Sequence, residues 1–446
     1  MKKTVPTQKG GPKPRPARFV AASKPKPQTA AQRAAAKRAL SKQTQRPKQA
    51  QQAASTPAQS AHRYETIALV LQGGGALGSY QCGVYEGLQS AGIEPNWFAG
   101  ISIGAINAAI LAGNAPEHRL ERLRGFWERI AVPAVPMAKH LLKLQERELN
   151  SVTLPSAWMA WADTQGALAA LFFGQSGFFV PRPPLALAGL TKNIAETSFY
   201  STAPLKSTLE EFIDFDRINA GDVRFSVGAV NVRSGNFAYF DNYGDNKVKV
   251  RAEHVMASGA LPPAFAAVEI DGEHYWDGGM VSNTPLDHVL GAAPRRDSLV
   301  FQVDLWRAQG ILPRNLMEVA ERQKDIQYSS RTRYSTKLVK DWQDMRTTLN
   351  ALLKEIPPDH VTAKMRAELE PWLSDRVYNV IHLIYQSKPF EEQYKDYAFA
   401  PTTMREHWNA GLCDMQETIA HPEFFAPPSR RVGAVTHDVH RTRGGA

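Results

Sequence analysis

The chain has 446 residues, 43% of them hydrophobic, which is enough for one large domain with extensions or for two domains. Its only cysteines are Cys82 and Cys413, so a disulfide framework and a cysteine-based zinc site are both excluded. We find no apolar segment typical of a secretory signal or of a membrane span. We therefore expect a cytoplasmic protein, soluble or peripheral on a membrane or lipid granule.

The net charge of +10 comes from one end of the chain. Residues 1–60 contain 14 Lys and Arg and no acidic residue, which leaves 39 basic and 43 acidic side chains for the rest. Residues 1–62 have few large apolar side chains to bury, and we expect them to be a disordered basic tail. Such an arm can bind an anionic membrane or a storage-granule surface, and its composition also fits a transit peptide or a plain linker. We expect no specific nucleic acid partner.

The first folded element expected is a buried strand over residues 66–72, because its near-continuous apolar run is typical of a parallel strand. A glycine-rich loop over residues 73–78 follows, and then an apolar helix to about Ser90. This order also fits a dinucleotide-binding turn. However, no strand ending in an acidic residue comes about twenty residues later, where a ribose contact is needed.

Residues 98–109 predict a second buried strand, a tight turn at Ser102 and a helix of small residues to about Gly113. A serine on such an elbow is exposed above the free N–H groups of a helix N-terminus, where developing negative charge is favoured. Gly100 and Gly104 leave room for the backbone beside it. Alone, this G-x-S-x-G pattern also fits an ordinary turn. Two glycine turns after adjacent strands favour acyl transfer, with the first loop binding the oxyanion and the second supplying the nucleophile.

An aromatic and proline-rich segment over residues 119–182 predicts a cap over the site, which either packs on the core or dips into lipid. Its aromatic residues are Trp127, Trp158, Trp161, Phe172, Phe173, Phe178 and Phe179.

Further along, we expect a helix within residues 199–216, hairpins over 223–240 and 268–276, and a buried strand over 299–305.

Asp277 directly follows the second hairpin. It stands between Trp276 and two glycines, a setting that desolvates a carboxylate and suits it to act as a base for a serine. The plain alternative is a turn aspartate that caps local N–H groups. In the chain order of an α/β-hydrolase triad, His288 would be a third member, but we expect His288 to be structural.

Four blocks in this order resemble the patatin-like phospholipase family: residues 73–78, 100–104, 257–262 and 277–279. The resemblance implies an α/β fold, a three-layer α/β/α sandwich with a mostly parallel central sheet, and a Ser–Asp dyad without histidine. It makes Ser102 the nucleophile and Asp277 the base, and it assigns the oxyanion hole to the backbone N–H groups of Gly73, Gly74 and Gly75. The other positions that it matches are Gly78, Gly100, Gly104, Gly278, Gly279, Asn283 and Pro285.

Leu77 departs from this pattern, because the family usually carries Arg or Lys at that position. The departure leaves neutral lipids, lysophospholipids, short acyl esters and a storage polyester as candidate substrates.

Beyond about residue 310 the chain resembles a mainly helical extension found in one bacterial subgroup of the family. Asn315 is placed to cap a helix, residues 377–385 predict a strand that joins the main sheet, and residues 402–419 predict a last helix. An apolar stripe is expected to pack on a neighbouring helix of the same chain. It consists of Leu338, Trp342, Met345, Leu349 and Leu352.

The expected organisation is a tail over residues 1–62, a hydrolase domain over 63–308, the extension over 309–426 and a loose end over 427–446. The function expected is a serine acyl hydrolase of the lipase or phospholipase type, acting on an acyl-ester lipid. No cofactor or metal is expected, since no H-E-x-x-H motif or Cys/His cluster is present. The alternative is a catalytically weak protein that binds a lipid or granule surface through the basic arm.

Overall fold

The computed structural model describes residues 56–131, 173–183, 193–330, 332–357, 360–369, 372–373, 376–386 and 395–440, all within the compact unit Ser55–Ala446. Residues 1–55 of the expected tail lie outside the described residues. Part of that tail does fold, because α2 (Pro57–Ala61) forms where disorder was expected. A capping box explains the difference: Thr56 N–H donates to the Gln59 side chain at 3.0 Å, and Gln59 N–H donates to the Thr56 hydroxyl at 3.2 Å.

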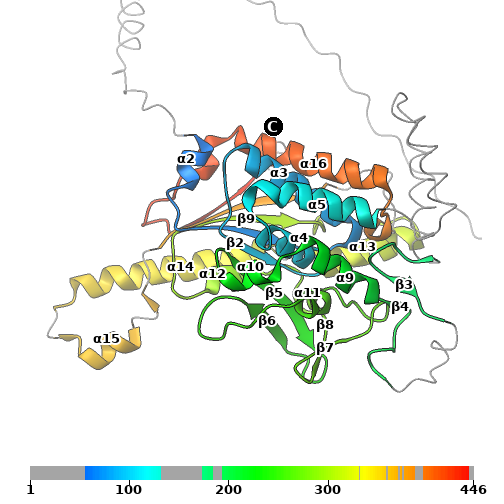
Figure 1. Ribbon diagram of the computed structural model, residues 1–446. Coiled ribbons are helices and arrows are strands. Elements are labelled where there is room, and N and C mark those ends of the chain that lie inside the picture. Colours follow the sequence, from blue (N-terminus) through cyan, green and yellow to red (C-terminus); the bar gives the residue numbers. More distant parts are fainter. Residues whose placement is uncertain are drawn as a thin grey trace, which may run out of the picture. The chain divides into compact units, whose positions relative to one another are not determined.

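A nine-stranded, mostly parallel sheet is the centre of the fold, in the order β11-β10-β9-β1-β2-β5-β8-β7, with β6 paired to β5 (Figure 1). The strands from β11 to β5 are parallel, whereas β6, β7 and β8 join by antiparallel pairing. The strand bounds are β1 (Thr66–Leu71), β2 (Trp97–Gly100), β5 (Arg224–Asn231), β6 (Phe237–Asp241), β7 (Val268–Ile270), β8 (Glu273–Asp277), β9 (Ser298–Asp304), β10 (Tyr378–Ile384) and β11 (Ala434–Asp438). A separate pair is formed by β3 (Val180–Pro181) and β4 (Tyr200–Ser201).

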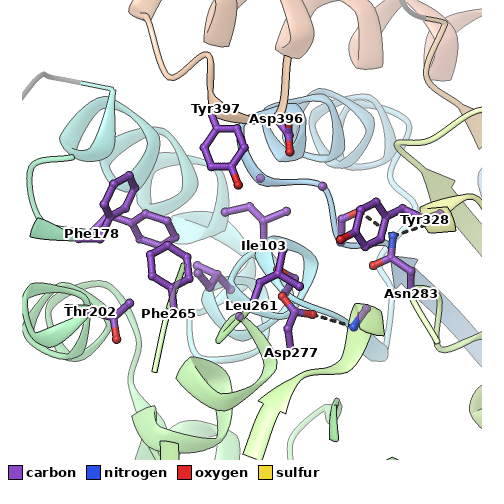
Figure 2. A pocket seen from close by; sticks show the side chains of 18 of the residues that line it. Ile103, Phe178, Thr202, Leu261, Phe265, Asp277, Asn283, Tyr328, Asp396 and Tyr397 are labelled. Atoms are coloured by element: carbon purple, nitrogen blue, oxygen red, sulfur yellow. Dashed lines mark hydrogen bonds between the residues drawn. The ribbon is translucent and has the colours of Figure 1, made fainter. Parts of the chain in front are cut away.

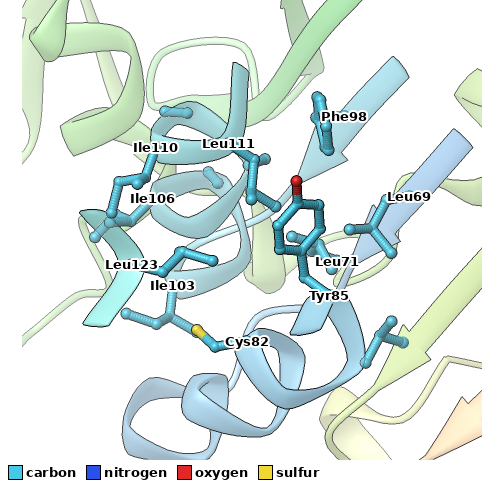
Figure 3. Close-up of a cluster of buried hydrophobic side chains, with 14 of the residues drawn as sticks. Leu69, Leu71, Cys82, Tyr85, Phe98, Ile103, Ile106, Ile110, Leu111 and Leu123 are labelled. Atoms are coloured by element: carbon cyan, nitrogen blue, oxygen red, sulfur yellow. The ribbon is translucent and has the colours of Figure 1, made fainter. Parts of the chain in front are cut away.

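Helices cover both faces of this sheet. Every residue of β1 is buried, and its side chains alternate between two apolar clusters, with Leu69 and Leu71 on one face and Ala68 and Val70 on the other. The first cluster contains side chains of α3 (Ser79–Ser90), α4 (Ile103–Ala112), α5 (Pro116–Ile130) and α16 (Pro401–Ile419), and Figure 3 shows part of it. The second contains side chains of α12 (Leu286–Gly291). The predicted three-layer α/β fold is therefore confirmed.

The α-helices after α2 are α3 (Ser79–Ser90), α4 (Ile103–Ala112), α5 (Pro116–Ile130), α9 (Ala203–Phe212), α10 (Phe215–Ala220), α11 (Ala252–Ser258), α12 (Leu286–Gly291), α13 (Leu316–Tyr328), α14 (Thr332–Glu355), α15 (Ala363–Leu369) and α16 (Pro401–Ile419). Short 3-10 turns are η1 (Gly75–Gly78), η2 (Gly278–Met280), η5 (Lys395–Tyr397) and η6 (Pro422–Phe425). Helices α3 and α16 lie side by side in Figure 1, and a Cβ on Gly83 of α3 would lie only 1.8 Å from the Trp408 carbonyl oxygen of α16.

The expected cap begins later than the sequence indicated. Residues up to 130 belong to α5, whose Phe126 and Trp127 are buried in the core. The Trp127 indole donates a hydrogen bond to Asn107 at 3.0 Å, which gives this aromatic residue a structural partner inside the fold. The cap residues Trp158, Trp161 and Phe172 lie outside the described residues, whereas Phe178 and Phe179 are described and reach the site discussed below.

Two expectations for the C-terminal part differ from the structure. The loose end expected over residues 427–446 contains β11, which pairs with β10 and extends the main sheet. The apolar stripe on α14 does not pack as predicted, because Leu338, Trp342 and Met345 are 39%, 44% and 53% exposed. Within the described residues, Trp342 stacks on Trp372 with ring centroids 6.2 Å apart. The predicted helix cap at Asn315 and the predicted joining of β10 to the sheet are confirmed.

Candidate active site

Ser102 occupies a strained elbow between β2 and α4. Its backbone has φ 55° and ψ −124°, a conformation that non-glycine residues rarely adopt. The Ser102 N–H donates to the Ser258 hydroxyl at 2.9 Å, and that hydroxyl donates to the Gly228 carbonyl at 2.6 Å. A Cβ on Gly104 would lie 2.3 Å from the Leu71 carbonyl oxygen, so only glycine allows α4 to approach β1 this closely. The predicted strand, elbow and helix of small residues are confirmed.

Asp277 ends β8 and lies beside this elbow. It is 3% exposed, and its Oδ1 accepts a hydrogen bond from the Gly279 N–H at 2.7 Å. Burial raises the pKa of Asp277 to about 7, against the lowering effect of hydrogen bonds from the Gly279 N–H and the Ser102 hydroxyl. No Lys, Arg or His of the described residues contributes to this shift. The structure thus places Ser102 and a buried carboxyl group with a raised pKa in the lining of the same pocket.

The glycine loop passes next to Ser102. A Cβ on Gly73 would lie 3.0 Å from the Ser102 Cβ and 2.4 Å from the Asn283 side-chain oxygen. The Gly73 N–H donates to the Asn283 carbonyl at 3.3 Å, so it differs from the predicted free oxyanion donor. For Gly74 and Gly75, no backbone acceptor is found among the described residues. These two N–H groups are the candidates that remain in the loop.

The loop is held in place by Asn283, which the resemblance had singled out, and by Trp306 and Gln72, which we did not assign from the sequence. The Gly73 carbonyl accepts hydrogen bonds from the Trp306 indole at 2.8 Å and from the Asn283 amide at 3.0 Å. Buried Gln72 accepts from the Trp306 N–H at 3.0 Å and donates to the Tyr328 carbonyl at 3.1 Å. A buried amide at the end of an apolar strand was the available signal for Gln72, since such a group needs partners.

The remaining positions singled out by the resemblance lie at close backbone contacts around the elbow. They are Gly78 against Ile103, Gly100 against Gly104, and Gly278 against Gly228. Because each of these glycines has another group within 2.7 Å of the position a Cβ would take, larger residues would displace the elbow or the aspartate.

A pocket of about 810 Å³ opens over Ser102 and Asp277. Figure 2 shows Phe178, Phe265 and Leu261 on one side of it and Tyr397, Asp396 and Tyr328 on others. The apolar lining consists of Ile103, Ile106, Phe178, Phe179, Leu205, Leu261, Phe265 and Phe399. The described end of the expected cap therefore does contribute to the pocket, through Phe178 and Phe179.

The C-terminal region also reaches this pocket. Tyr328, Asp396, Tyr397 and Phe399 belong to its lining. Leu77, which stands where the family usually has a cation, is fully buried. Lys324 of α13 lies behind this lining, with its Nζ 2.9 Å from both carboxyl oxygens of Asp396.

His288 does not join Ser102 and Asp277. Its Nε2 lies 3.1 Å from Asp241, and its ring stacks on Tyr239 with centroids 3.9 Å apart. This agrees with the expectation of a structural histidine. In the part of the chain that the structure describes, no group of three or more His, Cys, Asp or Glu is placed to hold a metal ion. None of the described helices has the length and apolar character needed to cross a bilayer.

Comparison with known proteins adds the family. Residues 69–290 match the family described as patatin-like phospholipase, and residues 326–431 match one described as patatin phospholipase. Among solved structures, VipD from Legionella pneumophila is similar at 16% identity, over 77% of this chain and 67% of that chain, with a TM-score of 0.31. No curated protein sequence matches this chain. Residues 69–290, which contain the elbow and the glycine loop, therefore form a patatin-like phospholipase domain, and members of this family are serine acyl hydrolases of lipid esters.

Proposed function

We propose that this protein hydrolyses acyl esters of lipids with Ser102 as the nucleophile and Asp277 as the base. The observation that supports this most is that Ser102 and Asp277 line the same pocket, where burial raises the pKa of the Asp277 carboxyl group to about 7. A base with that pKa is ionised in a large fraction of molecules at neutral pH and still attracts a proton strongly.

In the acylation step, Ser102 Oγ attacks the ester carbonyl carbon while its proton passes to Asp277. The carbonyl oxygen becomes an oxyanion, which the N–H groups of Gly74 and Gly75 stabilise. The tetrahedral intermediate then collapses to an acyl-serine. The alcohol leaves with the proton that Asp277 returns to it.

In the deacylation step, a water molecule gives its proton to Asp277 and attacks the acyl-serine carbonyl. Collapse of the second intermediate releases the fatty acid, and Ser102 Oγ recovers the proton. One carboxyl group thus serves both halves of the reaction, and no third residue is required.

The apolar side of the pocket suits the acyl chain. Phe178, Phe265 and Leu261 lie together there, and Phe179 packs on Phe265 with ring centroids 5.4 Å apart. An alkyl chain placed among these groups loses contact with water. This burial stabilises the bound ester by about 0.8 kcal/mol for each CH₂ group. This supports a lipid acyl ester as the substrate class.

Hydrolysis of p-nitrophenyl butyrate by the full-length protein tests the proposal. We expect Ser102→Ala and Asp277→Asn each to lower kcat by about a thousandfold or more, and His288→Asn to retain activity. A fluorophosphonate should label wild type at Ser102 and leave Ser102→Ala unlabelled. Equal rates in wild type, Ser102→Ala and Asp277→Asn would overturn the proposal and favour a lipid-surface binding protein.

We also expect the basic arm to hold the enzyme on an anionic surface, since residues 1–60 carry 14 Lys and Arg and no acidic residue. Deleting residues 1–55, which contain all of these Lys and Arg and end before α2, should reduce sedimentation with phosphatidylglycerol vesicles at low salt and leave p-nitrophenyl butyrate hydrolysis intact. Unchanged vesicle binding after the deletion would contradict this role.

A further inference from the structure

The turn η5 (Lys395–Tyr397) from the C-terminal region forms one wall of the pocket. A Cβ on Gly75 would lie only 2.3 Å from the Asp396 carbonyl oxygen, so η5 packs directly on the glycine loop. Asp396 and Tyr397 both belong to the pocket lining. Figure 2 shows their side-chain oxygens directed into the pocket, on a different side from Phe178 and Phe265.

Ion pairs hold η5 on α13. Lys324 of α13 contacts both carboxyl oxygens of Asp396 at 2.9 Å, and the Asp396 side chain is only 15% exposed. The neighbouring Lys395 side chain is 2% exposed and bonds to Asp325 at 2.9 Å and to Glu321 at 3.2 Å. Asp396 is therefore fixed at the pocket wall by a buried network.

Cationic side chains do not belong to the described part of the pocket lining, and Lys324 lies behind it, paired with the Asp396 carboxyl group. No Lys, Arg or His is found among the described residues that line the pocket. Asp277 and Asp396 both belong to that lining. A phosphate group in this place would meet carboxyl groups without an arginine or lysine to bind it. Neutral hydroxyl groups fit better, because a carboxylate accepts hydrogen bonds from them and the Tyr397 hydroxyl both donates and accepts.

We propose that η5 is the wall that contacts the alcohol part of the ester, and that Asp396 and Tyr397 select a neutral, polyhydroxylated alcohol over one that carries a phosphate. The acyl chain then lies on the side of Phe178 and Phe265. This proposal rests on the proposed esterase function and adds the substrate class to it.

The test compares three water-soluble butyrate esters with purified full-length protein. Monobutyrin has a neutral glycerol, its 3-phosphate has the same glycerol with an anionic group, and p-nitrophenyl butyrate has no hydroxyl on the alcohol. The selectivity is the kcat/KM for monobutyrin divided by that for the 3-phosphate. We expect a selectivity of about ten or more for wild type. A tenfold ratio corresponds to the free energy of one hydrogen bond to a charged group, or of one charge repulsion of similar strength.

Three variants give different directions. Asp396→Asn should lower the selectivity, because it removes the negative charge from the wall. Lys324→Met should raise the selectivity, because it leaves that charge without its partner. Tyr397→Phe should lower kcat/KM for monobutyrin relative to p-nitrophenyl butyrate by about threefold to tenfold. A matched control is Glu253→Gln, which breaks the Lys206–Glu253 ion pair outside the pocket and should leave the selectivity unchanged.

The outcomes separate the two proposals. Opposite shifts for Asp396→Asn and Lys324→Met support the selection by charge, whereas shifts in the same direction mean that the network only supports the loop. A wild-type selectivity near one overturns the inference while leaving the esterase function intact. Absence of hydrolysis of all three esters overturns the esterase function, and the inference with it.

Discussion

Two buried aspartates lie on two strands that pair with β5, and they differ in their hydrogen-bond partners and in the direction of their pKa shifts. Across β5, Asp277 lies opposite Ala229 and Asp241 lies opposite Ser226. Asp241 binds Arg224 at 2.7 Å, the Ser226 hydroxyl at 2.7 Å and His288 at 3.1 Å. Burial alone would raise the pKa of Asp241, but the hydrogen bonds from His288 and Arg224 hold it below its usual value. Asp277 has no such cation, and its pKa rises to about 7.

The difference shows what turns a buried carboxyl group into a base. A carboxylate that is paired with a guanidinium is stabilised in its charged form and has little tendency to accept a proton. The Asp–His pair that a hydrolase triad would use does exist in this chain, but it is formed by His288 and Asp241. Asp277 instead accepts a hydrogen bond from the Gly279 N–H, and among the described residues the Ser102 hydroxyl is the only side chain that lowers its pKa. Chemistry is therefore expected at the carboxyl group with the poorer set of partners.

The largest expected effect is on catalysis. Asp277→Asn should lower kcat for p-nitrophenyl butyrate by about a thousandfold or more, because the other carboxyl group of the pocket, Asp396, is paired with Lys324 through both of its oxygens. Asp241→Asn should change kcat by less than about threefold in the protein that remains folded. A large loss of kcat in folded Asp241→Asn would break the comparison, since it would mean that both carboxyl groups take part in the reaction.

The same pair of substitutions should change stability in opposite directions. The folded protein keeps a proton on Asp277 that the unfolded chain releases above pH 4, so stability falls as pH rises from about 4 to 7. Asp277→Asn removes this cost and should raise the free energy of unfolding at pH 8 by an amount on the order of 4 kcal/mol, with little change at pH 4.

The ionisation of Asp241 changes the stability of the fold with pH in the opposite direction. Because its pKa is lowered in the folded state, its contribution is present above the unfolded pKa and is lost as the pH falls. Asp241→Asn leaves Arg224 without its carboxylate and should lower the free energy of unfolding at pH 8 by about 3 kcal/mol. Urea denaturation of both variants at pH 8 and pH 4 measures the two changes. Destabilisation by Asp277→Asn at pH 8 would contradict the raised pKa.

The pH profile should report the base directly. Since Asp277 must be ionised to accept the serine proton, kcat/KM should have its midpoint near pH 7 and fall about tenfold per pH unit below it. A histidine base would produce a midpoint in a similar range, and His288→Asn separates the two. The profile should persist in that variant, and its loss there would assign the base to His288.

Local motifs explain why much of the site could be predicted from the sequence. The elbow at Ser102 is determined by neighbouring small residues, and Asp277 follows a hairpin whose Asp271-Gly272 turn is itself a local signal. The alternation of apolar runs and helices likewise determines the parallel sheet. These features depend on residues close together in the chain, which a sequence displays.

Contacts between distant segments could not be predicted in the same way. Nothing in the sequence around Lys395 and Asp396 indicates that this turn packs on Gly75, or that Lys324 pairs with Asp396. Amphipathic spacing on α14 predicted an apolar face but not whether a partner covers it, and Trp342 remains 44% exposed. The strand β11 is short and follows a polar segment, so its pairing depends on the edge that β10 presents.

The smallest expected effect concerns two buried serines, one hydrogen-bonded to Asp241 and the other to the elbow at Ser102. Ser226 donates to Asp241 at 2.7 Å, and Ser258 accepts from the Ser102 N–H at 2.9 Å. Replacing either by alanine leaves a buried partner unsatisfied and should lower the free energy of unfolding by about 1 to 3 kcal/mol. Only Ser258→Ala should also lower kcat, by about tenfold, because the strained elbow at Ser102 loses one of its supports.

The readout for this pair is the ratio of kcat in each folded variant to kcat of wild type, measured at a temperature well below both unfolding midpoints. Equal kcat for Ser226→Ala and Ser258→Ala would show that the hydrogen bond to the Ser102 N–H stabilises the fold without orienting the nucleophile. A tenfold loss of kcat confined to Ser258→Ala would instead show that this single hydrogen bond orients the elbow. The two serines are both fully buried, so the difference in kcat cannot be attributed to a difference in exposure.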